Sequence, residues 1–313
     1  MPQVSCLGIC VVDALSGPLA QYPVPRVRTL VATETIRFLP GGGAANSAGA
    51  LARMGLSVGI FSKVGDDPNG AFLIRELEAC GVDTGGIRVS AVDTTPFTFV
   101  GIHPDGDRTF IHTPGANKTF GLTDLSRDRL LEADFLLYQD LWVLPNMDGR
   151  PGASILEEAR QRGVVTLLDE CWGFGPNRET LETMLPYCDY ALPSLDDLRA
   201  VYPGMSAGEI ADHVLGFGVK AVILKMGSEG CLVATEANKV RIPAFPVEVV
   251  DATGAGDCWD AGFIAGLAHG EDLAAAARLG NACAAFCLGA VGGATGVPSY
   301  SAVRKRASVG ASR

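Results

Sequence analysis

The chain has 313 residues, 48% hydrophobic and 19% charged, which is long and apolar enough for one large α/β domain or two smaller ones. Its 35 acidic and 25 basic residues give a net charge of -10, so we expect neither a nucleic-acid partner nor an anionic membrane surface. Nine cysteines without a Cys-x-x-Cys pair are typical of buried thiols in a reducing cytoplasm.

Short apolar, β-branched runs alternate with amphipathic stretches along the chain. We expect strands at 4–12, 58–62, 135–138, 164–168, 190–192, 221–225 and 231–234. We expect helices at 44–54, 69–79, 154–162, 206–217 and 258–268. The first run lacks a basic start, which favours a strand over a signal peptide. The alternation predicts α/β architecture in one domain over 1–313, a doubly wound, mostly parallel sheet flanked by helices.

Two stretches, 15–39 and 96–113, interrupt this alternation. The second has alternating apolar and polar residues on both sides of Pro104-Asp-Gly-Asp107, which predicts a hairpin. We expect the two stretches to form a small β-sheet lid over the strand ends, where open α/β sheets bind ligands.

The segment 246–257 predicts a strand, a glycine turn and a helix that opens at Asp257. Backbone N–H groups of Gly254, Ala255 and Gly256 at a helix N-terminus form a hole for an anion such as a transferring phosphoryl group. The Asp257 carboxylate beside that hole is placed to accept the proton of an attacking hydroxyl. The alternative is that Asp257 only caps the helix.

A second glycine cluster, Gly41-Gly42-Gly43, precedes Asn46 and a helix of small residues. Together with Asp251-x-Thr-Gly-Ala-Gly-Asp257, it resembles the two signatures of the ribokinase-like (PfkB) carbohydrate kinase family. The likeness extends over nearly the whole chain. It includes Gly8-x-x-x-x-Asp13, Val64-Gly-Asp-Asp-x-x-Gly70, Lys225-Met-Gly-Ser-Glu-Gly230 and the stretch 292–298.

The resemblance implies a ribokinase-like fold and ATP-dependent transfer of the γ-phosphate to a hydroxyl, usually primary, of a free sugar. A nucleoside kinase and a non-catalytic sugar or nucleoside sensor are the alternatives. Implied substrate contacts are Asp13, Gly41, Gly42, Gly43 and Asn46, and implied nucleotide contacts are Lys225, Gly227, Gly230, Thr253 and Asn281. Asp13 as an ordinary turn residue and Lys225 as a surface strand end remain open. The resemblance also implies a homodimer that pairs through the lid.

Metal ions enter through the same resemblance. Mg²⁺ is expected with the nucleotide, and K⁺ is expected beside Asp251 and Thr253. Carbonyl groups near Cys287, Ala290, Gly292 and Gly296 complete the implied K⁺ site. The family commonly has Asn-x-x-Glu where this chain has Ser194-Leu-Asp-Asp197. Asp197 either holds magnesium through water or completes a capping box begun by Ser194.

Other patterns are weaker. Gly204-Met-Ser-Ala-Gly208 matches a hydrolase nucleophile elbow, but no buried strand precedes it, and Ser206 with Glu209 predicts a capping box. His103 and His112 flank the hairpin turn and could face substrate. Arg108 offers a single charge to a phosphorylated sugar, a substrate that the sequence disfavours. Asp169-Glu-Cys-Trp stands where many relatives have Asp-x-Asn.

Overall fold

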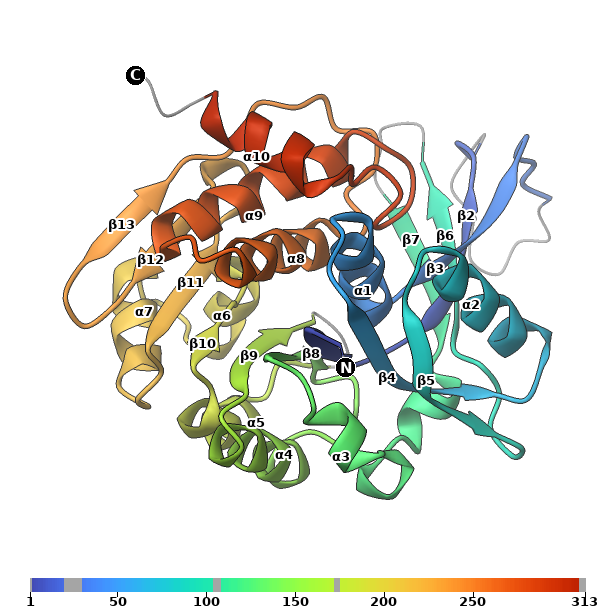
Figure 1. The fold of residues 1–313 in the computed structure, drawn as a ribbon. Helices are drawn as coiled ribbons and strands as arrows, with labels where there is room; N and C mark the ends of the chain where they lie inside the picture. Colours follow the sequence, from blue (N-terminus) through green and yellow to red (C-terminus); the bar gives the residue numbers. More distant parts are fainter. Residues whose placement is uncertain (1, 20–29, 104–107, 172–174, 310–313) are drawn as a thin grey trace.

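The computed structural model describes residues 2–19, 30–103, 108–171 and 175–309, and its largest element is a nine-stranded sheet (Figure 1). The order is β13-β12-β11-β10-β9-β8-β1-β4-β5. The strands are β1 (Val4–Leu7), β4 (Val58–Gly65), β5 (Asp83–Ser90), β8 (Phe135–Leu141), β9 (Val165–Glu170), β10 (Tyr190–Ala191), β11 (Ala221–Lys225), β12 (Cys231–Ala234) and β13 (Lys239–Ile242). Only the pairings of β12 are antiparallel within this described sheet, which confirms the predicted mostly parallel arrangement.

Helices cover both faces of this sheet, because alternate residues of its strands enter different apolar cores. In β1, Val4 and Cys6 belong to one core and Leu7 to the other. The first core is closed by α1 (Gly43–Arg53), α2 (Pro68–Ala79), α8 (Ala255–Ala268), α9 (Leu273–Leu288) and α10 (Tyr300–Ser308). The second is closed by α3 (Arg127–Leu130), α4 (Arg150–Gln161), α5 (Arg178–Met184), α6 (Leu195–Val201) and α7 (Ala207–Leu215). The doubly wound prediction is therefore confirmed.

A separate four-stranded sheet, which we call the small sheet, stands beside the large one (Figure 1). Its order is β3 (Ile36–Gly41), β2 (Val11–Ser16), β6 (Phe97–Ile102) and β7 (Arg108–Thr113). The β6–β7 hairpin was predicted, although its turn at 104–107 lies outside the described residues. The small sheet begins four residues before the expected lid segment 15–39, of which 20–29 are likewise not described.

The single strand predicted at 4–12 is wrong. The chain leaves the large sheet after Gly8, whose N–H still donates to Phe61 O at 3.2 Å. The next N–H, of Ile9, turns to the carboxylate of Asp140 at 2.8 Å. Val12 N then donates to Pro96 O at 3.0 Å, inside the small sheet. The run therefore links the two sheets, and continuous apolar character could not show this change of partner.

The strand predicted at 246–251 is also wrong. Residues 243–250 follow β13, the edge of the large sheet, and have no neighbouring strand in the described structure. The N–H groups of Val250 and Asp251 instead donate to Leu288 O at 2.8 and 3.3 Å. The end of α9 therefore holds this segment.

No helix in the described part of the chain combines the length and apolar character that a membrane span requires.

Candidate active site

A cavity of about 870 Å³ opens beyond the carboxyl ends of the parallel strands, between the first turns of α1 and α8. In the large sheet, β1 has β4 on one side and β8 on the other, and the chain fills the β4 side first and the β8 side later. Open α/β sheets usually bind ligands at such a point. Predicted site residues that line it are Asp13, Gly42, Gly43, Asn46, Asp197, Lys225, Gly227, Gly230, Thr253, Gly254, Ala255, Gly256, Asp257 and Asn281. Gly41, Asp251, Cys287, Ala290, Gly292 and Gly296 are not among the described lining residues.

The first turn of α8 presents its N-terminus to the cavity. Gly254 is the N-cap, with φ 73°, a left-handed conformation that favours glycine. A side chain there would also place its Cβ only 2.8 Å from Gly293 Cα. Because Gly254 occupies the cap and Asp257 lies within the first turn, the alternative of Asp257 as a helix cap is wrong. Its carboxylate is left for the cavity.

Asp257 is held from α1. Asn46 Nδ2 donates to Asp257 Oδ2 at 2.8 Å, and Ser47 Oγ donates to Asp257 O at 2.9 Å. Burial raises the pKa of the Asp257 carboxyl, and the Asn46 hydrogen bond partly opposes that rise. The two predicted glycine motifs therefore meet at one carboxylate that is more basic than an exposed aspartate.

Asp13 lies in the middle of β2 and faces the cavity, so the turn-residue alternative is wrong. Its side chain accepts a hydrogen bond from the Thr98 hydroxyl of β6. Burial raises its pKa to about 7, helped by the charges of Asp251 and Asp257.

The raised pKa of Asp13 predicts a pH effect on stability. The folded chain retains a proton that the unfolded chain releases above the ordinary pKa of 3.8, so the free energy of unfolding falls as pH rises from about 4 to about 7. Asp13→Asn is expected to make this fall shallower. Urea unfolding at several pH values measures the slope, and an unchanged slope would contradict the assignment.

Asp140 is a cavity residue that the sequence did not reveal. It lies within a register shift of β8, between Tyr138 and Leu141, and has φ 62°, which is uncommon for a residue other than glycine. Its buried carboxylate accepts N–H bonds from Gly43 at 3.1 Å and Ala44 at 3.3 Å, besides that from Ile9. A Cβ on Gly43 would lie 2.6 Å from Asp140 Oδ1, so the glycine makes room for the carboxylate. Burial raises the pKa of Asp140 to about 8.

Lys225, at the end of β11, is not a surface residue: its side chain is 12% exposed. Its Nζ contacts Asp169 Oδ1 at 2.7 Å and Asp260 Oδ1 at 3.1 Å. Asp260, on α8, was not predicted as a site residue. Asp169 is a partner of Lys225 although its segment departs from the family pattern. The carboxylates raise the pKa of Lys225, against the opposing effect of burial. An ammonium group is thereby fixed under the first turn of α8, where Gly256 also lines the cavity.

The segment 194–197 only partly matches its predicted roles. Ser194 is the N-cap of α6 but makes no side-chain capping bond, so the capping box predicted there is wrong. Its N–H donates to Glu170 Oε1 at 2.5 Å, and its hydroxyl bonds Asp197. Burial raises the pKa of Asp197, which lines the cavity. The capping box predicted at Ser206 and Glu209 is present, which explains that motif without catalysis.

Asp251 and Thr253 contact the small sheet. Arg108 Nη1, at the start of β7, lies 3.1 Å from Asp251 Oδ1 and 2.9 Å from Thr253 Oγ1. The Asp251 carboxylate also accepts N–H bonds from Thr253 and Gly292, both at 2.9 Å. Cys287 Sγ lies 3.3 Å from Thr253 O. Most of the predicted K⁺ residues are therefore close together, but the carboxylate already has a cationic partner.

Apolar side chains also line the cavity, with Phe245, Val247 and Leu288 in its wall. Gly227 and Gly230, which line the cavity as well, belong to the turn after β11. The Asn281 amide is used within the protein: Oδ1 accepts from Trp259 Nε1 at 2.7 Å, and Nδ2 donates to Ile242 O at 3.1 Å. Asn281 thus supports the cavity wall.

Neither histidine of the hairpin is among the described residues that line the cavity. His103 Nε2 lies 2.7 Å from Thr109 Oγ1, and His112 Nδ1 lies 3.0 Å from Thr98 Oγ1. Both rings therefore make hydrogen bonds within the small sheet.

A partly buried carboxylate beside a helix N-terminus, in a cavity lined by polar and apolar groups, is the arrangement of a phosphotransferase with an alcohol acceptor. The model for the pfkB family of carbohydrate kinases matches residues 1–299. The chain belongs to this family, and its class of activity is that of an ATP-dependent sugar kinase.

Relatives agree with that class. An ATP-dependent ribose-1-phosphate kinase of Halopiger xanaduensis is 32% identical over 84% of each chain. A ribokinase of Bacillus subtilis is 27% identical over 95% of this chain and 98% of its own. The crystal structure of a ribokinase from Thermotoga maritima superposes with a TM-score of 0.84 at 25% identity, over 98% of this chain and 99% of the other. The ribokinase-like fold prediction is therefore confirmed.

Proposed function

We propose that the chain transfers the γ-phosphate of ATP to a primary hydroxyl of a free sugar, with Asp257 as the general base. The observation that carries this proposal is the Asp257 carboxylate, held by Asn46 at 2.8 Å next to the Gly254–Gly256 turn. The substrate hydroxyl gives its proton to Asp257 while its oxygen bonds the γ-phosphorus. The bond from that phosphorus to the β–γ bridging oxygen breaks, and ADP leaves. N–H groups of Gly254, Ala255 and Gly256 stabilise the charge on the transferred group.

The acceptor is proposed to lie on the side of the cavity that Asp13 and Asn46 line. Asp13 and Asn46 are proposed to contact its hydroxyl groups, with backbone groups of Gly41, Gly42 and Gly43. Asp140 adds a further carboxylate to the cavity. The carboxyl groups of Asp13, Asp140 and Asp257 offer hydrogen-bond partners to a neutral polyol, whereas a sugar phosphate calls for cationic partners. Arg108, the charge that a sugar phosphate could use, is paired with Asp251, which also favours a neutral acceptor. Similarity to the ribose-1-phosphate kinase of Halopiger xanaduensis nevertheless makes a sugar phosphate the first competing acceptor to test.

The nucleotide is proposed to lie toward Gly227, Gly230 and Asn281, with its phosphates near Thr253 and Lys225. Mg²⁺ fits this arrangement as a companion of the phosphates, because the nearby carboxylate of Asp197 can hold a hydrated ion through water. No group of three or more His, Cys, Asp or Glu among the described residues is arranged to bind a metal directly. When bound, Mg²⁺ neutralises charge on the phosphate oxygens.

K⁺ fits less well. The proposed ligands are oxygens of Asp251 and Thr253 and carbonyls near Cys287, Ala290, Gly292 and Gly296. Arg108 and two backbone N–H groups already engage the Asp251 carboxylate. We therefore derive no step of the reaction from a monovalent cation.

Arg108 links the small sheet to the segment that leads into the anion hole. Arg108→Met is expected to lower kcat/KM for the acceptor by about 10- to 100-fold, since hydrogen bonds to charged groups contribute about 1.5–3 kcal/mol. Arg108→Lys retains the charge and is expected to lose less. Steady-state kinetics test this, and a value within twofold of the wild type for Arg108→Met would contradict it.

A homodimer is proposed to form through the small sheet. Ile36, Phe38 and Ile111 on its outer strands are 51%, 52% and 67% exposed, and a second copy would cover them. Light scattering after size exclusion tests this, and a monomer at micromolar concentration would contradict it. A cytoplasmic location is proposed from the nine free cysteines, which suit a reducing compartment.

The function is tested by ADP release with ATP, Mg²⁺ and a panel of free sugars, nucleosides and sugar phosphates. We expect turnover with one or more free sugars. Preferred turnover of a nucleoside or of a sugar phosphate would replace the acceptor class but keep the kinase. Ligand binding without turnover across the panel would instead establish the non-catalytic sensor.

A further inference from the structure

We propose that Lys63, outside the cavity, is a positioning residue that anchors the β6–β7 hairpin of the small sheet for acceptor binding. Lys63 lies near the end of β4, in the large sheet, and only 8% of it is exposed. Burying an ammonium group costs free energy unless the group is paired and hydrogen-bonded. The partners of Lys63 therefore identify the segments that it connects. They come from the segments that lead into and out of the hairpin.

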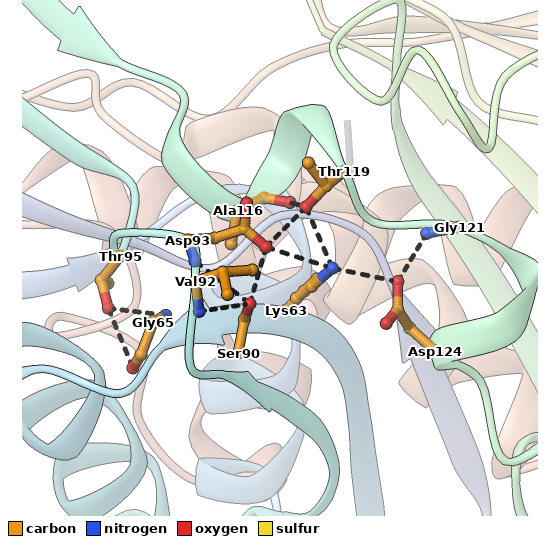
Figure 2. A network of polar contacts seen from close by, with 10 residues as sticks. All are labelled: Lys63, Gly65, Ser90, Val92, Asp93, Thr95, Ala116, Thr119, Gly121 and Asp124. Carbon is orange, nitrogen blue, oxygen red and sulfur yellow. Dashed lines mark hydrogen bonds and ion pairs between the residues drawn. The ribbon is translucent and has the colours of Figure 1, made fainter.

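Figure 2 shows these partners. Lys63 Nζ lies 3.3 Å from Asp93 Oδ2, in the segment before β6, and 3.4 Å from Asp124 Oδ2, after β7. It also donates to Thr119 Oγ1 at 2.9 Å, and that hydroxyl donates to Asp93 Oδ2 at 2.8 Å. Ser90 Oγ completes the set by donating to Asp93 Oδ2 at 2.7 Å. One ammonium group thus connects the entry and the exit of the hairpin to the large sheet.

A second set of bonds supports the same place. Gly65 N, two residues beyond Lys63, donates to Thr95 Oγ1 at 3.0 Å (Figure 2). Thr95 N donates to Asp67 Oδ2 at 2.8 Å, so the residue before Pro96 is tied to the N-cap of α2. The entry and exit also bond each other directly, through Ala116 N and Thr94 O at 2.9 Å. The hairpin therefore projects from a base that is fixed on both strands.

The hairpin carries this placement into the site. Thr98, on β6, donates to the Asp13 carboxylate that faces the cavity. Arg108, on β7, reaches Asp251 and Thr253 beside the anion hole. Both contacts lie on strands that join the segments held by Lys63, at Asp93 before β6 and at Thr119 after β7. A shift of these segments therefore moves the groups that contact Asp13 and Asp251. The nucleotide end, with Gly227 and Gly230, lies on β11 and its turn, and the contact of the hairpin with a proposed nucleotide residue is that of Arg108 with Thr253.

Replacement of Lys63 by an apolar residue leaves the carboxylates of Asp93 and Asp124 together without their shared cation. Lys63→Met keeps much of the length of the stem but removes the charge. Lys63→Arg restores the charge and the hydrogen-bond donors. Lys239→Met serves as the matched control, because Lys239 also pairs with a carboxylate, Asp212, but on the edge strand β13.

The direct readout is hydrogen exchange of the hairpin peptides, which needs no activity and so separates this inference from the proposed function on which its kinetic part rests. In Lys63→Met we expect amide exchange in β6 and β7 to be at least tenfold faster than in the wild type and in Lys239→Met. We expect the acceptor KM to rise at least tenfold while the dissociation constant for ATP changes less than threefold. Lys63→Arg is expected to recover most of both effects.

Other outcomes overturn the proposal. Unchanged exchange in the hairpin, in protein shown by near-UV circular dichroism to be folded, would show that Lys63 does not anchor it. Faster exchange spread over both sheets would show a general loss of stability. Faster hairpin exchange with an unchanged acceptor KM would show an anchor without effect on the acceptor. Absence of any kinase activity in the wild type would remove the proposed function but leave the exchange result to decide the anchoring.

Discussion

Asp257→Asn is expected to lower the turnover number by about 10²–10⁴-fold, the usual size of a general-base contribution. The new carboxamide can still accept the Asn46 bond through its oxygen, so the geometry at the first turn of α1 is retained. It cannot accept the proton of the attacking hydroxyl at neutral pH. The dissociation constant for ATP is expected to change little, because the N–H groups of Gly254–Gly256 remain in place. Single-turnover kinetics and nucleotide titration measure the two quantities.

The control for this prediction is Asp272→Asn. Asp272 caps α9 by accepting from Ala275 N at 2.8 Å, and asparagine is an equally good capping residue. That variant should keep turnover within about twofold of the wild type. Turnover of Asp257→Asn within tenfold of the wild type would contradict the role of Asp257 as the base.

The parts of the site that the sequence predicted are those whose chemistry is local. Gly254 and Gly256 sit in a short segment in which the glycines, the helix start and Asp257 are neighbours in the chain. Asn46 follows its own glycine cluster in the same way. In both segments the positive φ or the close approach is a property of residues a few positions apart, so the sequence shows it directly.

The parts that it did not predict depend on contacts between distant segments. Asp140 faces the cavity because a register shift in β8 turns its carboxylate toward the N-terminus of α1, about a hundred residues earlier. The sequence of α8 does not distinguish Asp260 from its neighbours, because its partner Lys225 lies on the distant strand β11. The apolar run 4–12 likewise divides between two sheets, because its N–H groups find hydrogen-bond acceptors on Pro96 and Asp140. Both acceptors lie far along the chain, so the run itself does not reveal them.

The periodicity of the sequence did not single out helix α9, for a different reason. This helix is rich in small residues, and many of them are buried, among them Ala276, Gly280 and Cys283. A helix that is apolar nearly all round has no polar face from which a period of 3.6 can be recognised. Its packing against α8 is clear only in the structure, where a Cβ on Gly280 would lie 2.6 Å from the Trp259 ring.

Lys225→Met is expected to lower the free energy of unfolding by about 3–5 kcal/mol, the usual cost of removing one partner from a buried ion pair. The side chain is 12% exposed, and the two carboxylates it joins, of Asp169 and Asp260, are 5% and 0% exposed. The partners raise the pKa of Lys225 in the folded chain, so its stabilising effect is present at every pH below the ordinary value of 10.5. Urea unfolding at pH 7 measures the loss.

A double-mutant cycle shows whether this loss belongs to the ion pair. Lys225→Met combined with Asp260→Asn leaves one buried carboxylate in place of two, so the double variant should be more stable than the sum of the single effects predicts. Lys239→Met breaks the more exposed pair with Asp212 and should cost about 1 kcal/mol or less. Additive effects in the cycle, or a loss for Lys225→Met as small as that of Lys239→Met, would mean that Lys225 is not held by its two carboxylates. If the loss is large and coupled, the same interaction that fixes the ammonium group under α8 also stabilises the fold, because its partners come from β9, β11 and α8.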